Sequence, residues 1–402
     1  MPLACLMLQP VHPLLFALAL ALPIGVAAED KDPPRLGIKG FGTLGLARSD
    51  DSDAGFVRDL SQPRGLTTHW SGKIDSVLGV QANYRFGERT EAVLQAVSRY
   101  RYDNGFGPEI TWAFLRHDFS PEWSLRAGRI GTEFFMLSDS RLVGYANLTV
   151  RPPVEFYGPL VFSYFDGLDL AATTQLGSGL LRGKLFAGHA AERAPVAPGL
   201  SWNLQGSRMF GGHVDYLSGP WQVRLGHTAI RFSHEMPINE FAGIDVLGLA
   251  PQLAAQGTWS HYDSLGVVYE QGALQIQGMV NRIHNETDQY ENSWAGYLIG
   301  AYRLGNFTPY TGYSQTRSSP LSLPAEMPAA QAAVIRYALS YSHSDQRTIF
   351  VGTRWDFAQN LALKAQVDRT HGQPDSRFLF RETTSGWDGR MTVFSLALDF
   401  VF

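Results

Sequence analysis

Cysteine is almost absent from this 402-residue chain, which contains only Cys5. Disulfide bonds and zinc sites built from thiolates are therefore excluded for the rest of the chain. Charge is also scarce, because Asp, Glu, Lys and Arg make up 17% of the residues and the formal net charge is −4. A nucleic-acid-binding domain is normally basic, so we expect no nucleic-acid partner.

Long apolar runs of the kind that form membrane-spanning helices are also missing. The mean hydropathy of −0.11 excludes a protein with several helical spans of about 20 apolar residues. Residues 14–22 (LLFALALAL) have instead the length of a signal-peptide core, and the small residues of 26–28 (VAA) follow as a cleavage pattern. No Lys or Arg precedes this core. We predict that residues 1–28 are a signal peptide and that residues 29–402 form a single exported domain.

Glycine and aromatic residues are plentiful, with 41 Gly, 24 Phe, 16 Tyr and 9 Trp. Many segments alternate with a period of two, most clearly at the end of the chain, where Phe394, Leu396 and Leu398 share one parity and Ser395 and Asp399 the other. This alternation is typical of strands with one apolar face. Similar patterns occur within residues 74–85, 274–281 and 361–368. We find no convincing amphipathic helix beyond residue 35.

The connections between these segments alternate strictly between short and long. Seven short and eight long connections predict sixteen strands, and sorting of loop length by end is typical of outer-membrane β-barrels rather than soluble β-sandwiches. The short connections lie at 87–88, 120–122, 177–179, 218–219, 271–272, 305–306 and 358–359, and the long ones at 48–71, 103–108, 131–167, 190–205, 232–258, 285–291, 317–346 and 371–390.

An eighteen-stranded version is the alternative, because Ile335, Tyr337, Leu339 and Tyr341 also alternate and a partner strand is available near residues 156–165. It places long connections at the short-turn end, so sixteen strands are preferred. Aromatic residues near the strand ends are expected to form girdles at the membrane interfaces. These are Tyr84, Phe86, Phe119, Trp123, Tyr216, Trp221, Trp259, Tyr269, Tyr302, Phe307, Trp355 and Phe357.

Both ends of the predicted barrel resemble Gram-negative outer-membrane porins. The segment 37–44 (GIKGFGTL) is similar to the opening strand of general porins, and 352–357 (GTRWDF), 362–366 (ALKAQ) and 398–402 (LDFVF) are similar to proteobacterial closing strands. Phe400 and Phe402 resemble the terminal signal that the barrel assembly machinery recognises. Segment 125–129 (LRAGR) is similar to the stretch that leads into a constriction loop.

The resemblance implies a transmembrane antiparallel β-barrel of sixteen strands with a third loop folded into its lumen. It further implies a homotrimer in the lipid of the bacterial outer membrane. Such a channel passes ions and small hydrophilic solutes passively, without a cofactor. Porin constriction loops usually carry a compact acidic motif, whereas the acidic residues of this loop are spread out, so the ion preference stays open.

Charged residues near the narrowest point are expected to set selectivity, because low-dielectric walls focus the field there. A basic wall that faces an acidic loop gives a transverse field; the alternative is that these charges only solvate the lumen. The candidates on the lumen parity are Arg99, Arg101, Arg126, Arg224 and Lys364; Arg129 lies on the other parity, and the loop acids are Glu133, Asp139 and Glu155.

Two further arginines, Arg141 and Arg151, belong to the third loop. They either form a basic ladder for an anionic solute or pair with Glu133 or Glu155 and fix the loop. The second role is favoured. A solute-selective porin of the same fold therefore remains an alternative.

Motifs for enzymes are weak in this sequence, and we predict no enzyme, no catalytic residue and no metal site. Residues 40–45 match G-x-G-x-x-G but lie within a predicted strand and precede a polar loop instead of a helix. The pairs His213/Asp215 and His261/Asp263 suit metal binding or proton transfer, although polar lining of the lumen is favoured. An outer-membrane lipase or protease and a soluble secreted β protein stay open as alternatives.

Overall fold

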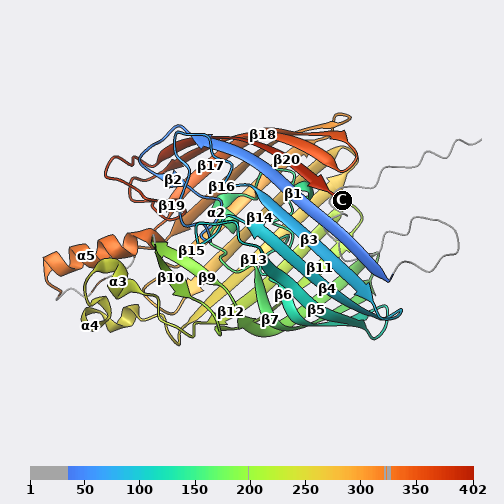
Figure 1. Cartoon of the computed structure of the whole chain (residues 1–402), viewed down its shortest axis with the longest axis horizontal. Coiled ribbons are helices and arrows are strands. Elements are labelled where there is room, and N and C mark those ends of the chain that lie inside the picture. The colour runs from blue at the N-terminus through green and yellow to red at the C-terminus, as the bar shows by residue number, and fades with distance from the viewer. Residues whose placement is uncertain (1–34, 198, 321–322, 324–326) are drawn as a thin grey trace, which may run out of the picture.

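Sixteen antiparallel strands close into one barrel in the computed structural model, which describes residues 35–197, 199–320, 323 and 327–402. Each barrel strand pairs with its sequence neighbours, and β1 (Leu36–Ser49) pairs with β20 (Arg390–Val401) at the seam (Figure 1). The fold class and strand count predicted from the sequence are confirmed. The predicted signal peptide lies outside the described residues. The other barrel strands are β3 (Val77–Arg85), β4 (Thr90–Arg99), β5 (Glu109–Asp118), β6 (Trp123–Gly131), β7 (Tyr164–Leu176), β8 (Gly179–Ala190), β11 (Arg208–Ser218), β12 (Trp221–Arg231), β13 (Trp259–Gln271), β14 (Leu274–Asn285), β15 (Ser293–Tyr302), β16 (Phe307–Ser318), β17 (Asp345–Ala358) and β18 (Leu361–Gly372).

The connections differ between the two ends of the barrel, as the sequence predicts. One end carries tight turns in which Gly272 and Gly305, both at φ +62°, supply the left-handed conformation. The other end carries the long loops, which gather at the left of Figure 1 opposite the C-terminus. These loops contain β2 (Gly55–Phe56), η1 (Gly144–Ala146), α2 (Val154–Tyr157), β9 (Arg193–Ala197), β10 (Leu200–Asn203), α3 (Ile238–Ala242), α4 (Val246–Leu249), η2 (Pro251–Leu253), α5 (Ala329–Leu339), η3 (Ser340–Ser342) and β19 (Phe380–Arg381).

The additional strand considered for residues 335–341 is a helix instead. Ile335, Tyr337 and Leu339 belong to α5, and residues 156–165 contribute the end of α2 and the start of β7. Both the eighteen-strand alternative and the expectation of no helix beyond residue 35 are therefore wrong. The alanines of α5 favour a helix, and its residues Ala332, Ile335, Ala338 and Leu339 are buried at helical spacing.

Among the described residues, no helix is long and apolar enough to cross a membrane.

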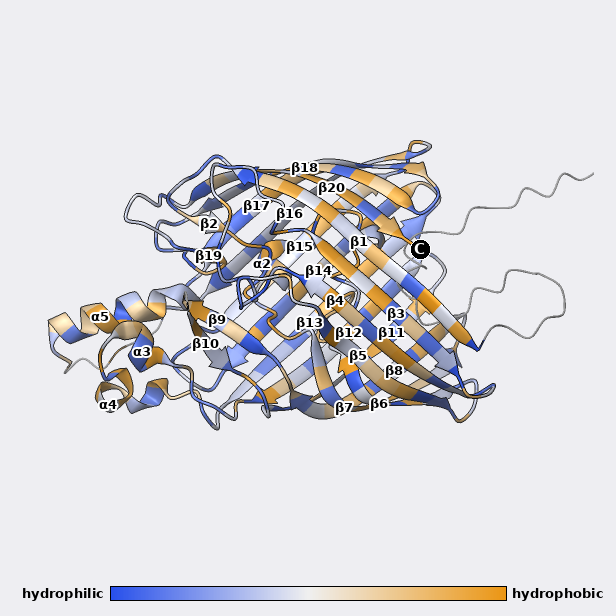
Figure 2. Ribbon diagram, in the orientation of Figure 1, coloured by the Kyte–Doolittle hydropathy of each residue, from blue (hydrophilic) through white to orange (hydrophobic). Residues whose placement is uncertain are grey.

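Along most of the barrel wall, apolar side chains face outward and polar side chains face inward. On β20, Phe394 and Leu396 are about 40% exposed (39% and 43%), whereas Ser395 and Asp399 are buried. Figure 2 shows the resulting apolar positions alternating along the strands. This arrangement is the reverse of that in a soluble protein and is the pattern of a barrel whose outer face contacts lipid.

Glycines at the seam make room for aromatic rings on the neighbouring strand. The Phe400 ring covers Gly42 and the Phe402 ring covers Gly40, so that a Cβ at either glycine would overlap the ring. Such aromatic cover of strand glycines stabilises sheets that otherwise lose side-chain packing there. The glycines of the G-x-G-x-x-G match therefore have a packing role within β1.

The aromatic residues predicted to form girdles gather mainly at the short-turn rim. Trp221 packs on Tyr269 at a centroid distance of 4.6 Å, and Phe307 stacks on Trp355 at 5.5 Å. Trp259 lies instead at the loop end, where β13 begins. The short-turn rim thus carries packed aromatic pairs on its outer face.

Candidate functional site in the barrel lumen

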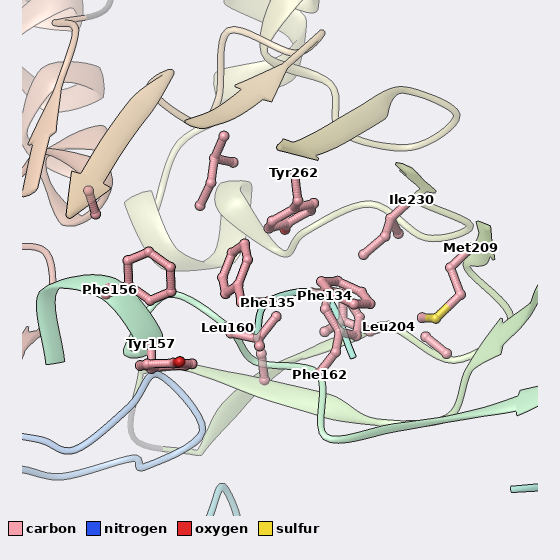
Figure 3. Close-up of a cluster of buried hydrophobic side chains, with 14 of the residues drawn as sticks. Phe134, Phe135, Phe156, Tyr157, Leu160, Phe162, Leu204, Met209, Ile230 and Tyr262 are labelled. Carbon is pink, nitrogen blue, oxygen red and sulfur yellow. The ribbon is translucent and has the colours of Figure 1, made fainter. Parts of the chain in front are cut away.

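The third loop, residues 132–163 between β6 and β7, folds into the lumen and packs against the wall. Phe134 contacts Tyr262 of β13 at a ring distance of 5.3 Å, and Phe156 contacts Tyr297 of β15 at 5.1 Å. Figure 3 shows these loop residues converging with side chains from the wall. Phe134 and Phe156 are at most 1% exposed, so burial of apolar area holds the loop inside. The predicted inward-folded third loop is confirmed.

Arg151 fastens the loop to the opposite wall. Its Nε and Nη2 donate to the two carboxylate oxygens of Asp75 at 2.8 and 2.7 Å, and its Nη1 donates to Asp368 at 2.9 Å. Both ion pairs are buried. Arg151 therefore fixes the loop, but its partners are Asp75, just before β3, and Asp368 of β18 rather than Glu133 or Glu155. Arg141 of the same loop donates to the carbonyl of Phe162.

Lys364 and Glu155 also act as anchors of the third loop. Lys364 is fully buried, and its Nζ donates to the carbonyls of Gly144, Asn147 and Thr149 at 2.6–3.1 Å. Glu155 is buried and accepts hydrogen bonds from Ser314, Gln346 and Thr348. Because these contacts occupy both charged groups, the structure does not place them at a free constriction surface.

On the other side of the loop, Glu133 faces a basic wall. It pairs with Lys184 of β8 and, at 2.9 Å, with Arg126 of β6. Arg126 also pairs with Asp169 of β7. Arg224 of β12 makes a two-pronged contact with Asp215 and lies 4.0 Å from Glu133. We call this group the charged cluster; its members are Arg126, Glu133, Asp169, Lys184, His213, Asp215 and Arg224.

The basic wall keeps Glu133 ionised. Burial alone would raise the pKa of this carboxyl, but Lys184, His213, Arg126 and Arg224 together lower it well below the usual range. Three predicted residues, Arg126, Glu133 and Arg224, thus meet in one place. Sequence reasoning missed Asp169 and Lys184, although both lie on the inward parity of their strands, which was a usable signal.

Arg99 and Arg101 belong to a second group, nearer the loop end. Arg99 donates to Ser61 at 2.7 Å and lies within 4 Å of Asp59, Glu109 and Glu192. Arg101 pairs with Glu109 at 2.5 Å. Burial, and to a smaller extent repulsion from the carboxylate of Glu109, raises the pKa of Glu192 to about 7. This group ties loops to the barrel rim and does not join the charged cluster.

Arg129 lies on the outward-facing parity, where it pairs with Asp166 at 2.7 Å, so it is not part of the lumen wall. Asp139 is exposed and borders a cavity of about 20 Å³ between the third loop and the wall.

Asp263 also points outward and contacts His227 at 2.7 Å. Polar lining of the lumen is therefore wrong for His261/Asp263, whereas the His213/Asp215 pair does lie inside.

Two cavities flank the third loop. A cavity of about 50 Å³ at the short-turn side is bordered by Arg303, Arg354 and Asp356. A cavity of about 150 Å³ at the loop end is bordered mainly by aromatic and aliphatic residues. Within the described part of the chain, no three His, Cys, Asp or Glu side chains are grouped to hold a metal ion.

Solved structures with the same barrel are porins and other outer-membrane channels. OmpF of Salmonella typhi, in complex with daunomycin, matches with a TM-score of 0.58 and 9% identity over 91% of this chain and 97% of that chain. The anion-selective porin of Comamonas acidovorans gives 0.56 and 14% over 91% and 99%. The channel DcaP of Acinetobacter baumannii gives 0.55 and 12% over 91% and 97%. The chain therefore has a porin-like fold. No family model and no curated protein sequence matches the chain.

Proposed function

We propose that the protein is a passive channel for ions and small hydrophilic solutes in a bacterial outer membrane. The observation that carries this proposal is the third loop, held inside a closed barrel by buried aromatic contacts and by the ion pairs of Glu133 with Arg126 and Lys184 of the wall. A narrowed lumen lined by charged side chains lets polar solutes pass and disfavours apolar ones. The proposal assigns no catalysis and no cofactor.

The outer surface supports a membrane location. Exposed leucines such as Leu185 (68%) and Leu225 (61%) face outward from the strands, and aromatic residues follow at the short-turn rim. In lipid, only a closed barrel satisfies every backbone group of a sheet. We further propose that lipid surrounds the barrel, that the barrel assembly machinery recognises β20, and that three copies associate as in the porins that the sequence resembles.

The charged cluster predicts only a weak preference between cations and anions. With His213 taken as neutral, Arg126, Lys184 and Arg224 supply three positive charges, and Glu133, Asp169 and Asp215 supply three negative charges. Their sum is zero, and each of these charges contacts an opposite one. Orientation of dipolar solutes, more than exclusion of one ion sign, follows from this arrangement.

Conductance of residues 29–402, refolded and inserted in a planar bilayer, tests the proposal. We expect discrete current steps and a small reversal potential in a potassium chloride gradient; steps in groups of three would support the trimer. The boiled, unfolded protein serves as the control. A silent bilayer with a sample that migrates as a folded barrel would overturn the proposal.

A further inference from the structure

The cavity at the loop end, which we call the mouth cavity, lies where loops from both halves of the chain converge on the end of the third loop. It has a volume of about 150 Å³. Its walls come from the loop ends of β13–β15, from β10, and from the segments that follow β12 and β18.

Eight aromatic side chains and a similar number of aliphatic ones line the mouth cavity. Trp202 stacks on Tyr290 with a ring distance of 5.6 Å and an interplanar angle of 19°. Phe232 packs on Trp202 at 4.7 Å, and Tyr262 and Phe162 border the cavity from the lumen side. An apolar cavity of about 150 Å³ in another protein is large enough to bind benzene. The mouth cavity therefore has the size and the lining for one six-membered ring.

One cationic group borders this aromatic space without a carboxylate partner. Nε and Nη2 of Arg381 donate to the carbonyls of Gln62 and Leu60 at 2.9 and 2.8 Å. Among the described residues, no carboxylate oxygen lies within 4 Å of Arg381. Burial lowers the pKa of this guanidinium to about 10, and the attraction of Asp59 and Glu382, which form no ion pair with it, opposes the shift only in part.

The acidic residue of the same wall is already neutralised. Glu291 accepts a hydrogen bond from His343 at 2.7 Å and another from Ser318. The Glu291 hydrogen bond, opposed by burial, raises the pKa of His343, which favours the charged imidazolium. The remaining free charge of the cavity wall is therefore positive.

We propose that the mouth cavity binds small aromatic carboxylates, with the ring among Trp202, Phe232 and Tyr290 and the carboxylate on Arg381. This inference rests on the proposed channel function and names its preferred solutes. The apolar lining of the mouth cavity and its single cationic group are typical of ligand pockets, in which a few polar groups fix the orientation of an otherwise apolar ligand. A ligand held there is concentrated directly above the third loop.

Equilibrium binding to the folded, detergent-solubilised protein tests the inference independently of conduction. Calorimetric titration with benzoate, benzyl alcohol and acetate separates the contributions of ring and charge. We expect benzoate to bind about 30-fold or more tighter than acetate, because the ring adds buried apolar area. Arg381→Gln should weaken benzoate about 10-fold and benzyl alcohol less than about 2-fold. The benzoate affinity of Arg381→Lys should lie between those of the wild type and Arg381→Gln. Arg377→Gln, which removes one positive charge outside the cavity wall, is the matched control.

Filling the cavity provides the second variant. Ala194 of β9 borders the cavity and Ala197 of the same strand does not, so Ala194→Leu should abolish ring binding whereas Ala197→Leu should not. If Ala194→Leu does not fold, Ser293→Leu at the start of β15 replaces it. Benzoate binding no tighter than acetate binding, or binding unaffected by both cavity-filling variants, overturns the inference. A protein that conducts but binds no benzoate overturns this inference and supports the proposed channel function. A folded barrel that binds benzoate but does not conduct supports the binding site and overturns the channel function.

Discussion

Single residues at the seam show how tightly β1 and β20 fit. Gly40 and Gly42 have no side chain, and the rings of Phe402 and Phe400 occupy the space above them. On the inner face, Phe41 covers Gly79 of β3 in the same way. The terminal aromatic residues that resemble an assembly signal thus also pack on the first strand. The same two side chains, Phe400 and Phe402, therefore pack on β1 and belong to the expected assembly signal.

Replacement of Gly42 by Ala should destabilise the barrel, because the new Cβ overlaps the Phe400 ring. Overpacking of this kind typically costs about 1–3 kcal/mol. Unfolding in guanidinium, followed by tryptophan fluorescence, measures the change. Gly37→Ala on the same strand is the control, because nothing lies within 4 Å of its Cβ position. Equal midpoints for the two variants would contradict the proposed fit.

Removal of single charges from the charged cluster should move the ion preference in opposite directions. Glu133→Gln leaves a net charge of +1 and Lys184→Gln leaves −1, because the intact cluster sums to zero. We expect the reversal potential to shift toward anions in the first variant and toward cations in the second, by comparable amounts. Arg129→Gln on the outer face is the control. A shift of the same sign in both variants would place the narrowest point elsewhere.

The third loop is the element that narrows the lumen of the barrel. Aromatic packing holds one side of it and the buried ion pairs of Arg151 hold the other. Breaking a buried ion pair by removal of one partner generally costs about 3–5 kcal/mol, since the remaining charge stays buried. The loop therefore depends on Arg151 more than on any exposed pair.

Arg151→Met should loosen the third loop without opening the barrel. Asp75 and Asp368 then lose their common partner, and we expect a lower unfolding midpoint together with larger current fluctuations in single-channel records. Arg129→Met, which removes a half-exposed pair, should change stability by less than about 1 kcal/mol. Quiet, wild-type currents from folded Arg151→Met would show that the apolar contacts suffice.

The connection between β14 and β15 is tied to the segment before β17 by the Glu291–His343 pair. The pKa of His343 is raised by its hydrogen bond to Glu291, so the tie is fully present below the ordinary histidine pKa of about 6.5 and is lost as the pH rises through the raised value. We expect the protection of amides near residue 343 against exchange, corrected for the base-catalysed intrinsic rate, to fall on the alkaline side. His343→Gln should remove this pH dependence; an unchanged profile would assign it to other groups.

The sixteen barrel strands of the described structure form a ring without a free edge, and this closure should be visible on a gel. The folded protein is expected to migrate faster when it is not boiled, because a closed barrel resists detergent unfolding. Removal of residues 390–402 deletes β20 and leaves edges on β1 and β18. The truncated chain should migrate identically with and without boiling. Compact migration of this chain would contradict closure through β20.

At this scale, sequence alone predicts the barrel well because period-two alternation and turn residues are local signals. The helix α5 was missed because Ile335 and Leu339 satisfy the spacing of both a strand and a helix. The partners in the lumen were missed for a different reason. Arg151 meets Asp75 and Asp368, which are 76 and 217 residues away, and strand parity indicates which side a residue faces but not what it meets across the lumen.

The seam also determines the order in which the chain becomes stable. Thr43 of β1 donates to Asp399 of β20 across a sequence separation of 356 residues, so this contact waits for nearly the whole chain to be synthesised. Until then, every partial sheet ends in two rows of unpaired backbone groups, which attract other strands. Contacts of such long range form slowly. The last strand therefore determines when the chain stops being prone to aggregation, and any factor that holds β20 near β1 protects all the strands between them.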